Sequence, residues 1–425
     1  MDLTTAKADD IRARHDAAHA RMDELRGRNL SLDMTRGKPS PEQLTFSDKL
    51  LIAVQPGDTT GEDGTDLRNY GGLAGIPEAR RLFAEYLGTE PERVIVGGNS
   101  SLSMMWDVLS NAVNFGMPGG EGPWRDQSPK MLCPVPGYDR HFAICERLGM
   151  EMINIPMTPD GPDMDTIREL VTNDPSVKAI WCVPKYSNPS GESYSEETVK
   201  ALASMPTAAK DFRIMWDNAY AVHHIADGLA TLTDIMDACD KADNPDRPIV
   251  FGSTSKLTLA GAGVAMLASS LVNIKDHLEK IGHGTIGPDK INQLRHVRFF
   301  KNMDGILEHM KKHAESIAPK FAAVDEALEK HLGGTGLARW TRPAGGYFVS
   351  VDVLDGCASA VIAKCAEAGV KMTPAGCTYP YNRDPHDANI RIAPTLPGID
   401  EIQIAMNVLT AAILEVCTKK LLEDA

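Results

Sequence analysis

Residues able to perform covalent chemistry lie at the ends of two short apolar runs in the middle of the chain. The run PIVFGSTSK ends in Ser253, Ser255 and Lys256, and the run RIMWDNAY contains Asp217, with Tyr220 three residues later. A lysine amine can form an imine with an aldehyde, and an aspartate can keep a heterocyclic nitrogen protonated. These residue types suggest chemistry at a carbonyl carbon, supported by an electron-withdrawing ring.

Further polar groups follow other apolar runs. The run RVIVGG leads into Ser100 and Ser101 at the start of an expected helix, where backbone amides and two hydroxyls suit a phosphate dianion. A plain alternative is that a serine only caps this helix. KMLCPV leads to Tyr138, and VKAIWCVP leads to Asn188. Because ligands gather at the carboxyl ends of strands in open α/β sheets, these positions are candidates for one site.

Each of these residues also has an ordinary structural interpretation. Tyr138 suits the edge of a core, Asn188 a turn, Asp217 a helix cap and Lys256 a solvated surface. Taken together, however, they match what pyridoxal 5'-phosphate (PLP) requires: an amine for its aldehyde, a carboxylate at its ring nitrogen, donors to its phenolic oxygen, an aromatic face and a phosphate cup. These groups are supplied, in the same order, by Lys256, Asp217, Tyr220 with Asn188, Tyr138 and the serines.

The order of the motifs NPSG, DNAY, STSK and NIRIAP resembles that of the fold type I, class I/II aminotransferases over nearly the whole chain. The segments RGKPS and STSKLTLAGAGVAML are similar to those of a divergent bacterial subgroup that includes aspartate aminotransferases. The resemblance implies that Lys256 carries PLP as a Schiff base. It also implies ping-pong transamination, in which the freed lysine amine acts as base and acid.

The resemblance assigns roles to three further positions. Arg391 in NIRIAP matches the arginine that grips the substrate α-carboxylate, which a planar guanidinium can bind bidentately. Gly37 in RGKP matches the glycine of the loop that closes over substrate. Tyr70 in NYGG matches the tyrosine that reaches the phosphate in the neighbouring subunit. The resemblance therefore implies a homodimer with shared active sites.

The phosphate contacts depart from the family pattern at one position. Ser253 and Ser255 match the phosphate cup, and the Asn188–Pro189 bond is expected to be cis. Many family members, however, carry an arginine a few residues after the lysine, where this chain has Val264. The groups expected to neutralise the phosphate instead are a helix dipole, Ser100, Ser101, Ser253, Tyr70 and, as a candidate cation, Arg36.

Seven apolar runs between residues 93 and 270 look like strands, with helical segments between them. Most are continuously apolar, as expected when helices cover both faces of a sheet. We therefore predict an α/β protein, and the resemblance implies that it has the PLP transferase fold of type I. Its mostly parallel seven-stranded sheet, flanked by helices, lies in a large PLP-binding domain over residues 46–300. Residues 1–45 and 301–425 are expected to form a smaller α+β domain, with strands around 346–353 and 390–393. A long helical region is expected over 287–331.

The expected substrates are an amino acid and a 2-oxo acid, with L-aspartate and 2-oxoglutarate as the first choice. Transamination of alanine or aromatic amino acids, and a PLP-dependent lyase reaction, stay open as alternatives. A dicarboxylate substrate needs a second cation beside Arg391. The candidates, each of which could instead be solvated, are Arg36, Lys38, Lys290, Arg295 and Arg298.

Composition argues against several other classes of function. The chain has 425 residues, 43% of them hydrophobic, and a formal net charge of −14, which disfavours nucleic acid and anionic membranes as partners. Its eight cysteines form no CxxC motif, so no metal is expected. The apolar stretches, such as residues 261–268, look too short to span a bilayer, and the N-terminus shows no apolar signal segment. These features favour the cytoplasm.

Two further interpretations carry less weight. A ligand-sensing regulator with this fold would need a basic DNA-binding domain, and the segment before Leu32 has no basic excess. His309 and His313 share a helix face but lack an HExxH motif, so we expect surface histidines rather than metal ligands.

Overall fold

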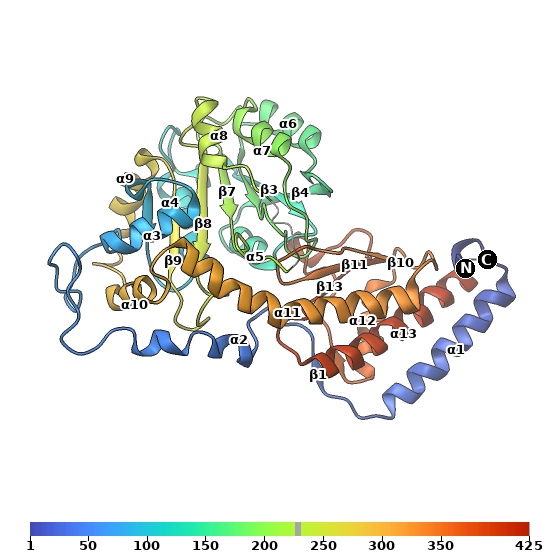
Figure 1. The fold of residues 1–425 in the computed structure, drawn as a ribbon. Coiled ribbons are helices and arrows are strands. Elements are labelled where there is room, and N and C mark those ends of the chain that lie inside the picture. The colour runs from blue at the N-terminus through green and yellow to red at the C-terminus, as the bar shows by residue number, and fades with distance from the viewer. Residues whose placement is uncertain (226–230, 425) are drawn as a thin grey trace.

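The structure, a computed structural model, describes residues 1–225 and 231–424. Its largest element is an eight-stranded sheet, which lies in the upper part of Figure 1. Across the sheet the strands follow the order β2 (Val94–Val96), β9 (Ala265–Ala268), β8 (Pro248–Ser253), β7 (Arg213–Asp217), β6 (Val177–Cys182), β3 (Lys130–Val135), β4 (Glu151–Thr158) and β5 (Gly161–Pro162).

The seven strands predicted from the sequence are all present, and the two-residue β5 adds an eighth. Strands β3, β4, β6, β7 and β8 run parallel to their neighbours in this group. Strand β9 is antiparallel to both β2 and β8, so the sheet is mostly but not entirely parallel. The chain order reverses between β3 and β6, which creates a topological switch point at their carboxyl ends.

Helices cover both faces of this sheet, which explains why its strands are apolar throughout. In β2, Val94 and Val96 pack into the core on one face, and Ile95 packs into the core on the other. One face is covered by α3 (Pro77–Leu87), α6 (Met164–Asn173), α7 (Glu196–Ser204) and α8 (Ile235–Lys241); the other by α4 (Ser101–Phe115), α5 (Asp139–Arg147) and α9 (Leu271–Ile281).

A second layer of structure contains an antiparallel sheet of β10 (Ala338–Trp340), β11 (Val349–Val353) and β13 (Asn389–Ile392). The sequence pattern revealed β11 and β13 but not β10, because three residues with a central arginine make no apolar run. Strands β1 (Leu32–Asp33) and β12 (Val370–Lys371) form a separate parallel pair. The remaining elements are α1 (Ala8–Arg26), α2 (Pro41–Thr45), α12 (Ala358–Glu367), η1 (Leu3–Thr5), η2 (Asp48–Ile52), η3 (Pro91–Arg93), η4 (Trp124–Gln127) and η5 (Pro380–Asn382).

The helical region predicted over 287–331 consists of two helices. Helix α10 (Lys290–Phe300) ends at Lys301, whose φ of 68° is incompatible with a continuing helix, and α11 (Met303–Leu332) follows. The first half of α11 packs in the core beside the large sheet, whereas its second half packs with α1, α12 and the last helix, α13 (Ile399–Glu423). In Figure 1, α11 crosses from one part of the molecule to the other.

The last helix, α13 (Ile399–Glu423), is long and apolar enough to cross a bilayer by composition, a feature that the sequence reasoning overlooked. In the structure 72% of its most apolar window is buried inside the protein. The helix packs in one core with α1, α11 and α12, so its apolar surface is accounted for by protein contacts.

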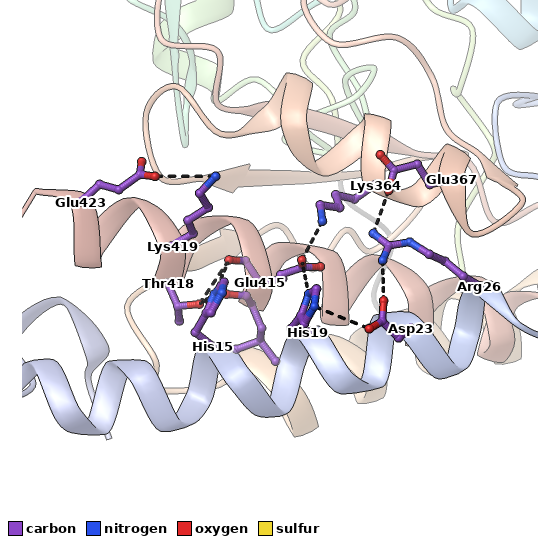
Figure 2. A network of polar contacts seen from close by, with 11 residues as sticks. His15, His19, Asp23, Arg26, Lys364, Glu367, Glu415, Thr418, Lys419 and Glu423 are labelled. Carbon is purple, nitrogen blue, oxygen red and sulfur yellow. Dashed lines mark hydrogen bonds and ion pairs between the residues drawn. The ribbon is translucent and has the colours of Figure 1, made fainter.

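A buried carboxylate ties the N-terminal helix to α13 (Figure 2). Glu415 Oε1 accepts a hydrogen bond from Lys364 Nζ at 2.6 Å and lies 2.9 Å from His19 Nδ1. His15 Nδ1 lies 3.1 Å from the Glu415 carbonyl oxygen. These contacts hold α1 against α12 and α13, and α1 leads directly into the segment that carries Gly37.

Candidate functional site

A cavity of about 220 Å³ lies at the carboxyl ends of the central strands. The strand order β8, β7, β6, β3 places the segments carrying Lys256, Asp217, Asn188 and Tyr138 side by side. The sequence-predicted residues that line this cavity are Gly37, Ser100, Ser101, Tyr138, Asn188, Asp217, Tyr220, Ser253, Ser255 and Lys256. Arg391 and Tyr70 are not in the lining.

Lys256 follows β8 and presents its amine to two aromatic rings. The Nζ atom lies 4.8 Å from the ring centre of Tyr220 and 5.7 Å from that of Tyr347. Burial lowers the pKa of the Lys256 amine from its ordinary value, and the negative charge of Asp217 partly opposes this shift. A lysine with a lowered pKa is the form of amine that acts as a nucleophile and base.

Asp217 ends β7 and is only 3% exposed. Its Oδ2 atom lies 3.0 Å from His141 Nε2, whereas its Oδ1 atom has no hydrogen-bond partner among the described residues. The His141 ring stacks on Trp181, with ring centres 4.0 Å apart, so its orientation is fixed. A buried carboxylate oxygen without a partner costs free energy, and it therefore points to a ligand group in the cavity.

The N-terminus of α4 opens onto the cavity. Ser100 is the N-cap residue, but its side chain makes no capping hydrogen bond, so the plain capping interpretation is wrong. Ser255 Oγ contacts the carbonyl oxygen of Asn99 at 3.4 Å. Unpaired amides at a helix N-terminus and free hydroxyls are suited to a phosphate group. Val264 is buried, and Lys256 is the sole cation among the lining residues, so these neutral donors and the helix dipole are what this chain offers a phosphate there.

Asn188, Tyr220 and Tyr138 complete the walls. The Asn188–Pro189 bond is cis, as expected, and Asn188 Oδ1 is buried without a partner among the described residues. Burial raises the pKa of the Tyr220 phenol well above its ordinary value and that of Tyr138 to about 12, so both keep their protons at neutral pH.

Gly37 lies against the ring of Phe348. A Cβ atom at position 37 would come within 2.1 Å of that ring, so no other residue fits without moving it. Phe348 also contacts Arg391, whose Cζ lies 5.0 Å from the ring centre. Arg391 is therefore adjacent to the cavity through Phe348 although it does not line it.

Tyr70 does not reach this cavity. Its side chain is 81% exposed on a loop that Lys290 holds by donating hydrogen bonds to the carbonyl oxygens of Asn69 and Gly71, at 2.7 and 2.8 Å. The predicted role of Tyr70 therefore requires a second copy of the chain.

The five candidate cations for a second substrate carboxylate have different surroundings. Lys290 is used in holding the Tyr70 loop, and Arg298 forms an ion pair with Asp58. Arg295 is partly buried, and its Nε has no partner among the described residues. Arg36 and Lys38 are exposed on either side of Gly37.

A buried polar network lies behind Lys256 and corrects the expectation of surface histidines. His309 and His313 are 5% and 1% exposed. His309 Nε2 lies 2.7 Å from the Leu257 carbonyl oxygen, and His313 Nδ1 lies 3.0 Å from Gln43 Nε2. Tyr347 also contacts Gln43 and donates to the Lys256 carbonyl oxygen at 3.4 Å. The histidines are buried because α11 faces the lysine segment, which a helical pattern alone could not show.

The sequence reasoning missed two further residues of the site, His141 and Phe348. His141 is in the first turn of α5, three residues after Tyr138, so the rule that selected Tyr138 could have found it. Nothing comparable marked Phe348, because its contacts with Gly37 and Arg391 join distant parts of the chain.

A wider cleft, of about 810 Å³, lies elsewhere, along β10, β11 and the end of β3. Its charged lining residues include Arg339, Asp352 and Asp355, but among the described lining residues it holds no lysine. The smaller cavity is the better candidate because amine, carboxylate and anion-binding groups converge there.

Known proteins resemble this chain along its whole length. The family model for aspartate amino-transferase matches residues 3–424. The chain is 48% identical to an aspartate aminotransferase of Corynebacterium glutamicum, over 97% of this chain and 96% of that protein. A crystal structure of an aspartate transaminase from the same species superposes with a TM-score of 0.97 at 47% identity, covering 99% of both chains.

A more distant structure shares the fold. It is an α-aminoadipate aminotransferase of Thermus thermophilus, complexed with N-(5'-phosphopyridoxyl)-L-leucine, with a TM-score of 0.74 and 21% identity over 93% of this chain and 94% of that one. Aminotransferases of this fold use PLP. Together with the two high identities and the family match, this establishes that the chain belongs to the aspartate aminotransferase family.

Proposed function

We propose that the cavity holds PLP and that the protein transfers the amino group of L-aspartate to 2-oxoglutarate. The observation that carries the cofactor assignment is Asp217, a buried carboxylate whose Oδ1 has no partner among the described residues, in the same cavity as the Lys256 amine. The choice of aspartate is supported by the 48% identity to the Corynebacterium glutamicum enzyme.

The residues present fit the cofactor. Lys256 offers the amine for its aldehyde, Asp217 the carboxylate for its ring nitrogen, and the α4 N-terminus with Ser100 the donors for its phosphate. When bound, PLP supplies an electrophilic carbon and a ring that withdraws electrons from the substrate Cα. Tyr138 borders the ring position, and the remaining contacts come from Ser101, Asn188, Tyr220, Ser253 and Ser255.

The chain's own groups then have separable tasks. Arg391 binds the α-carboxylate of the amino acid and so orients its Cα. Lys256 removes the proton from that Cα, and its lowered pKa favours the neutral amine that this step needs. Gly37 and Phe348 close the substrate side of the cavity and exclude water. For the second carboxylate we propose Arg36 or Lys38, the exposed cations that flank Gly37.

We further propose a homodimer. The exposed Tyr70 would donate a hydrogen bond to the phosphate of the partner's cofactor. Such a donor supports the phosphate site because Lys256 is the one cation among the described residues that line the cavity. We also propose residues 46–300 as the large domain and 1–45 with 301–425 as the small one, supported by separate cores, although α11 contributes to both. The eight free cysteines, all buried, support a cytoplasmic location.

A screen of amino donors and oxo acceptors on the purified, PLP-loaded protein tests this proposal. We expect the highest kcat/KM for aspartate with 2-oxoglutarate, measured as the rate of oxaloacetate formation. Preference for alanine or an aromatic amino acid would overturn the substrate assignment. Release of ammonia without amino transfer would indicate a lyase and overturn the proposed reaction.

A further inference from the structure

The guanidinium of Arg391 is held by a carboxylate on a helix that packs against the other sheet. Arg391 lies in β13 of the three-stranded sheet, and its side chain is 7% exposed. Its Nη1 donates a hydrogen bond of 2.9 Å to Asp139 Oδ1. Asp139 is the first residue of α5, which packs on the eight-stranded sheet. This ion pair therefore joins the two layers of the molecule beside the cavity.

The contact with Asp139 leaves the other edge of the guanidinium free. A guanidinium presents its N–H groups in a rigid fork, in which Nε and Nη2 form an edge suited to a carboxylate. The Arg391 Nε atom is buried and has no hydrogen-bond partner among the described residues. Phe348 lies against the group at 5.0 Å and restricts the tilt of its plane. The fork is thus fixed at one end and on one face, and the Nε of its carboxylate-binding edge is unpaired among the described residues.

The first turn of α5 also supports the other end of the site. Its N-cap residue is Tyr138, which lines the cavity, and its third residue is His141, which contacts Asp217. One helical turn therefore sets the aromatic wall, the carboxylate of Asp217 and, through Asp139, the guanidinium of Arg391. Because the turn is rigid, these groups keep a constant spacing.

We propose that Asp139 is a positioning residue that holds Arg391 by Nη1 so that its Nε–Nη2 edge is presented to the substrate α-carboxylate. This inference rests on the proposed carboxylate-binding role of Arg391. Asp139 has two opposing effects on a bound carboxylate: its hydrogen bond orients the guanidinium, and its negative charge repels the substrate. If removing the whole Asp139 side chain weakens carboxylate binding, the orientation of Arg391 outweighs the charge repulsion.

The Asp139→Ala and Asp139→Asn variants separate these effects. Both remove the charge, but only asparagine retains an oxygen that accepts from Nη1. For Asp139→Ala we expect a rise of about 10- to 100-fold in KM for both the amino acid and the oxo acid, which is the effect of losing one hydrogen bond to a charged group. For Asp139→Asn we expect KM within a few-fold of the unsubstituted protein, and for both variants a smaller change in kcat.

A merely structural role for Asp139 would give a different result. It would alter the cofactor absorbance through Tyr138 and Asp217, whereas positioning leaves this absorbance unchanged. The matched control is Asp165→Ala in the first turn of α6, where Asp165 accepts from Arg168 at 2.8 Å and is 95% exposed. We expect no change in KM for this control.

Calorimetric titration of the PLP-loaded protein with succinate, an unreactive dicarboxylate, measures carboxylate binding without turnover. Asp139→Ala should weaken succinate by the same factor as KM, with recovery in Asp139→Asn. Unchanged or tighter binding in Asp139→Ala, or equal losses in both variants, would overturn the inference. If the unsubstituted protein bound succinate but transferred no amino group, the proposed function would be overturned. The comparison of succinate binding among the Asp139 variants would still test the positioning role.

Discussion

Two lysine–aspartate combinations lie at opposite ends of the central strands of the large sheet. Lys178 in β6 and Asp211, just before β7, are at the amino ends, while Asp217 and Lys256 are at the carboxyl ends of β7 and β8. Both contain a carboxylate that is at most 3% exposed. Their residue types are the same, so type and burial do not distinguish a structural pair from a functional one.

Hydrogen bonding does distinguish them. Lys178 Nζ donates to Asp211 Oδ1 at 3.1 Å and to Gln127 Oε1 at 2.7 Å, and Asp211 Oδ2 accepts from Trp124 Nε1 at 2.6 Å. By contrast, Asp217 Oδ1 has no partner among the described residues. A polar group that is buried and satisfied stabilises one structure, whereas one left unsatisfied in the wall of a cavity is free to bind a ligand there.

The largest expected difference comes from the same substitution at the two lysines. Lys256→Met should reduce amino transfer below detection, because no other lysine is among the described residues that line the cavity. It should also abolish the visible absorbance of the bound cofactor. Steady-state kinetics and a spectrum of the PLP-loaded protein test this, and retained turnover would contradict the functional role of this end of the sheet. Lys178→Met is the control, for which we expect unchanged kcat.

The second effect concerns the carboxylate at the functional end. Asp217→Asn keeps the shape but removes the charge that supports the ring nitrogen, and kcat should fall on the order of 10³-fold, as for loss of one strong electrostatic contact in an active site. Single-turnover kinetics with aspartate would measure it. The stability of the cofactor-free protein should change little, since Asp217 Oδ1 has no partner among the described residues and the asparagine can keep one contact with His141 Nε2. A large loss of stability with normal kcat would mean that this pair, too, is structural.

The third effect is on the free energy of unfolding and concerns the pair Lys178 and Asp211 at the amino ends of the strands. Lys178→Met leaves Asp211 as a buried charge without its cation, and removing one partner of such a pair costs about 3–5 kcal/mol of unfolding free energy. Urea unfolding measures this cost. The comparison variant is Lys241→Met, whose ion pair with Asp237 is exposed and should contribute no more than about 1 kcal/mol. Equal effects of the two substitutions would contradict the assignment.

The smallest effect is a pH dependence at Lys256. Burial lowers the folded-state pKa of Lys256 below the ordinary value of 10.5. At pH values between the folded-state pKa and 10.5, the unfolded cofactor-free chain therefore binds more protons than the folded chain. The free energy of unfolding rises with pH in this interval. The free-energy cost of burying the charged amine is complete below the folded-state pKa and absent well above 10.5. Lys256→Met, which has no such penalty, should therefore gain most over the unsubstituted protein at low pH, and the gain should shrink at high pH. Urea unfolding at several pH values tests this; a constant gain would contradict it.

The sequence alone determined the sheet and the polar residues at its carboxyl edge. Seven strands were visible because both faces of the sheet are covered, which requires continuously apolar runs. Lys256, Asp217, Asn188 and Tyr138 were visible because each follows such a run, and adjacent parallel strands end at one edge. The short strands β5 and β10 carry too few residues to form a pattern.

Tertiary structure alone decided which side chains meet. The pairs His141 with Asp217, Asp139 with Arg391 and Gly37 with Phe348 join segments far apart in the chain, and no local pattern encodes such contacts. The burial of His309 and His313 likewise depended on how α11 faces the lysine segment. The physical reason is that strand and helix periodicity is a property of neighbouring residues, whereas the satisfaction of a buried polar atom depends on everything packed around it.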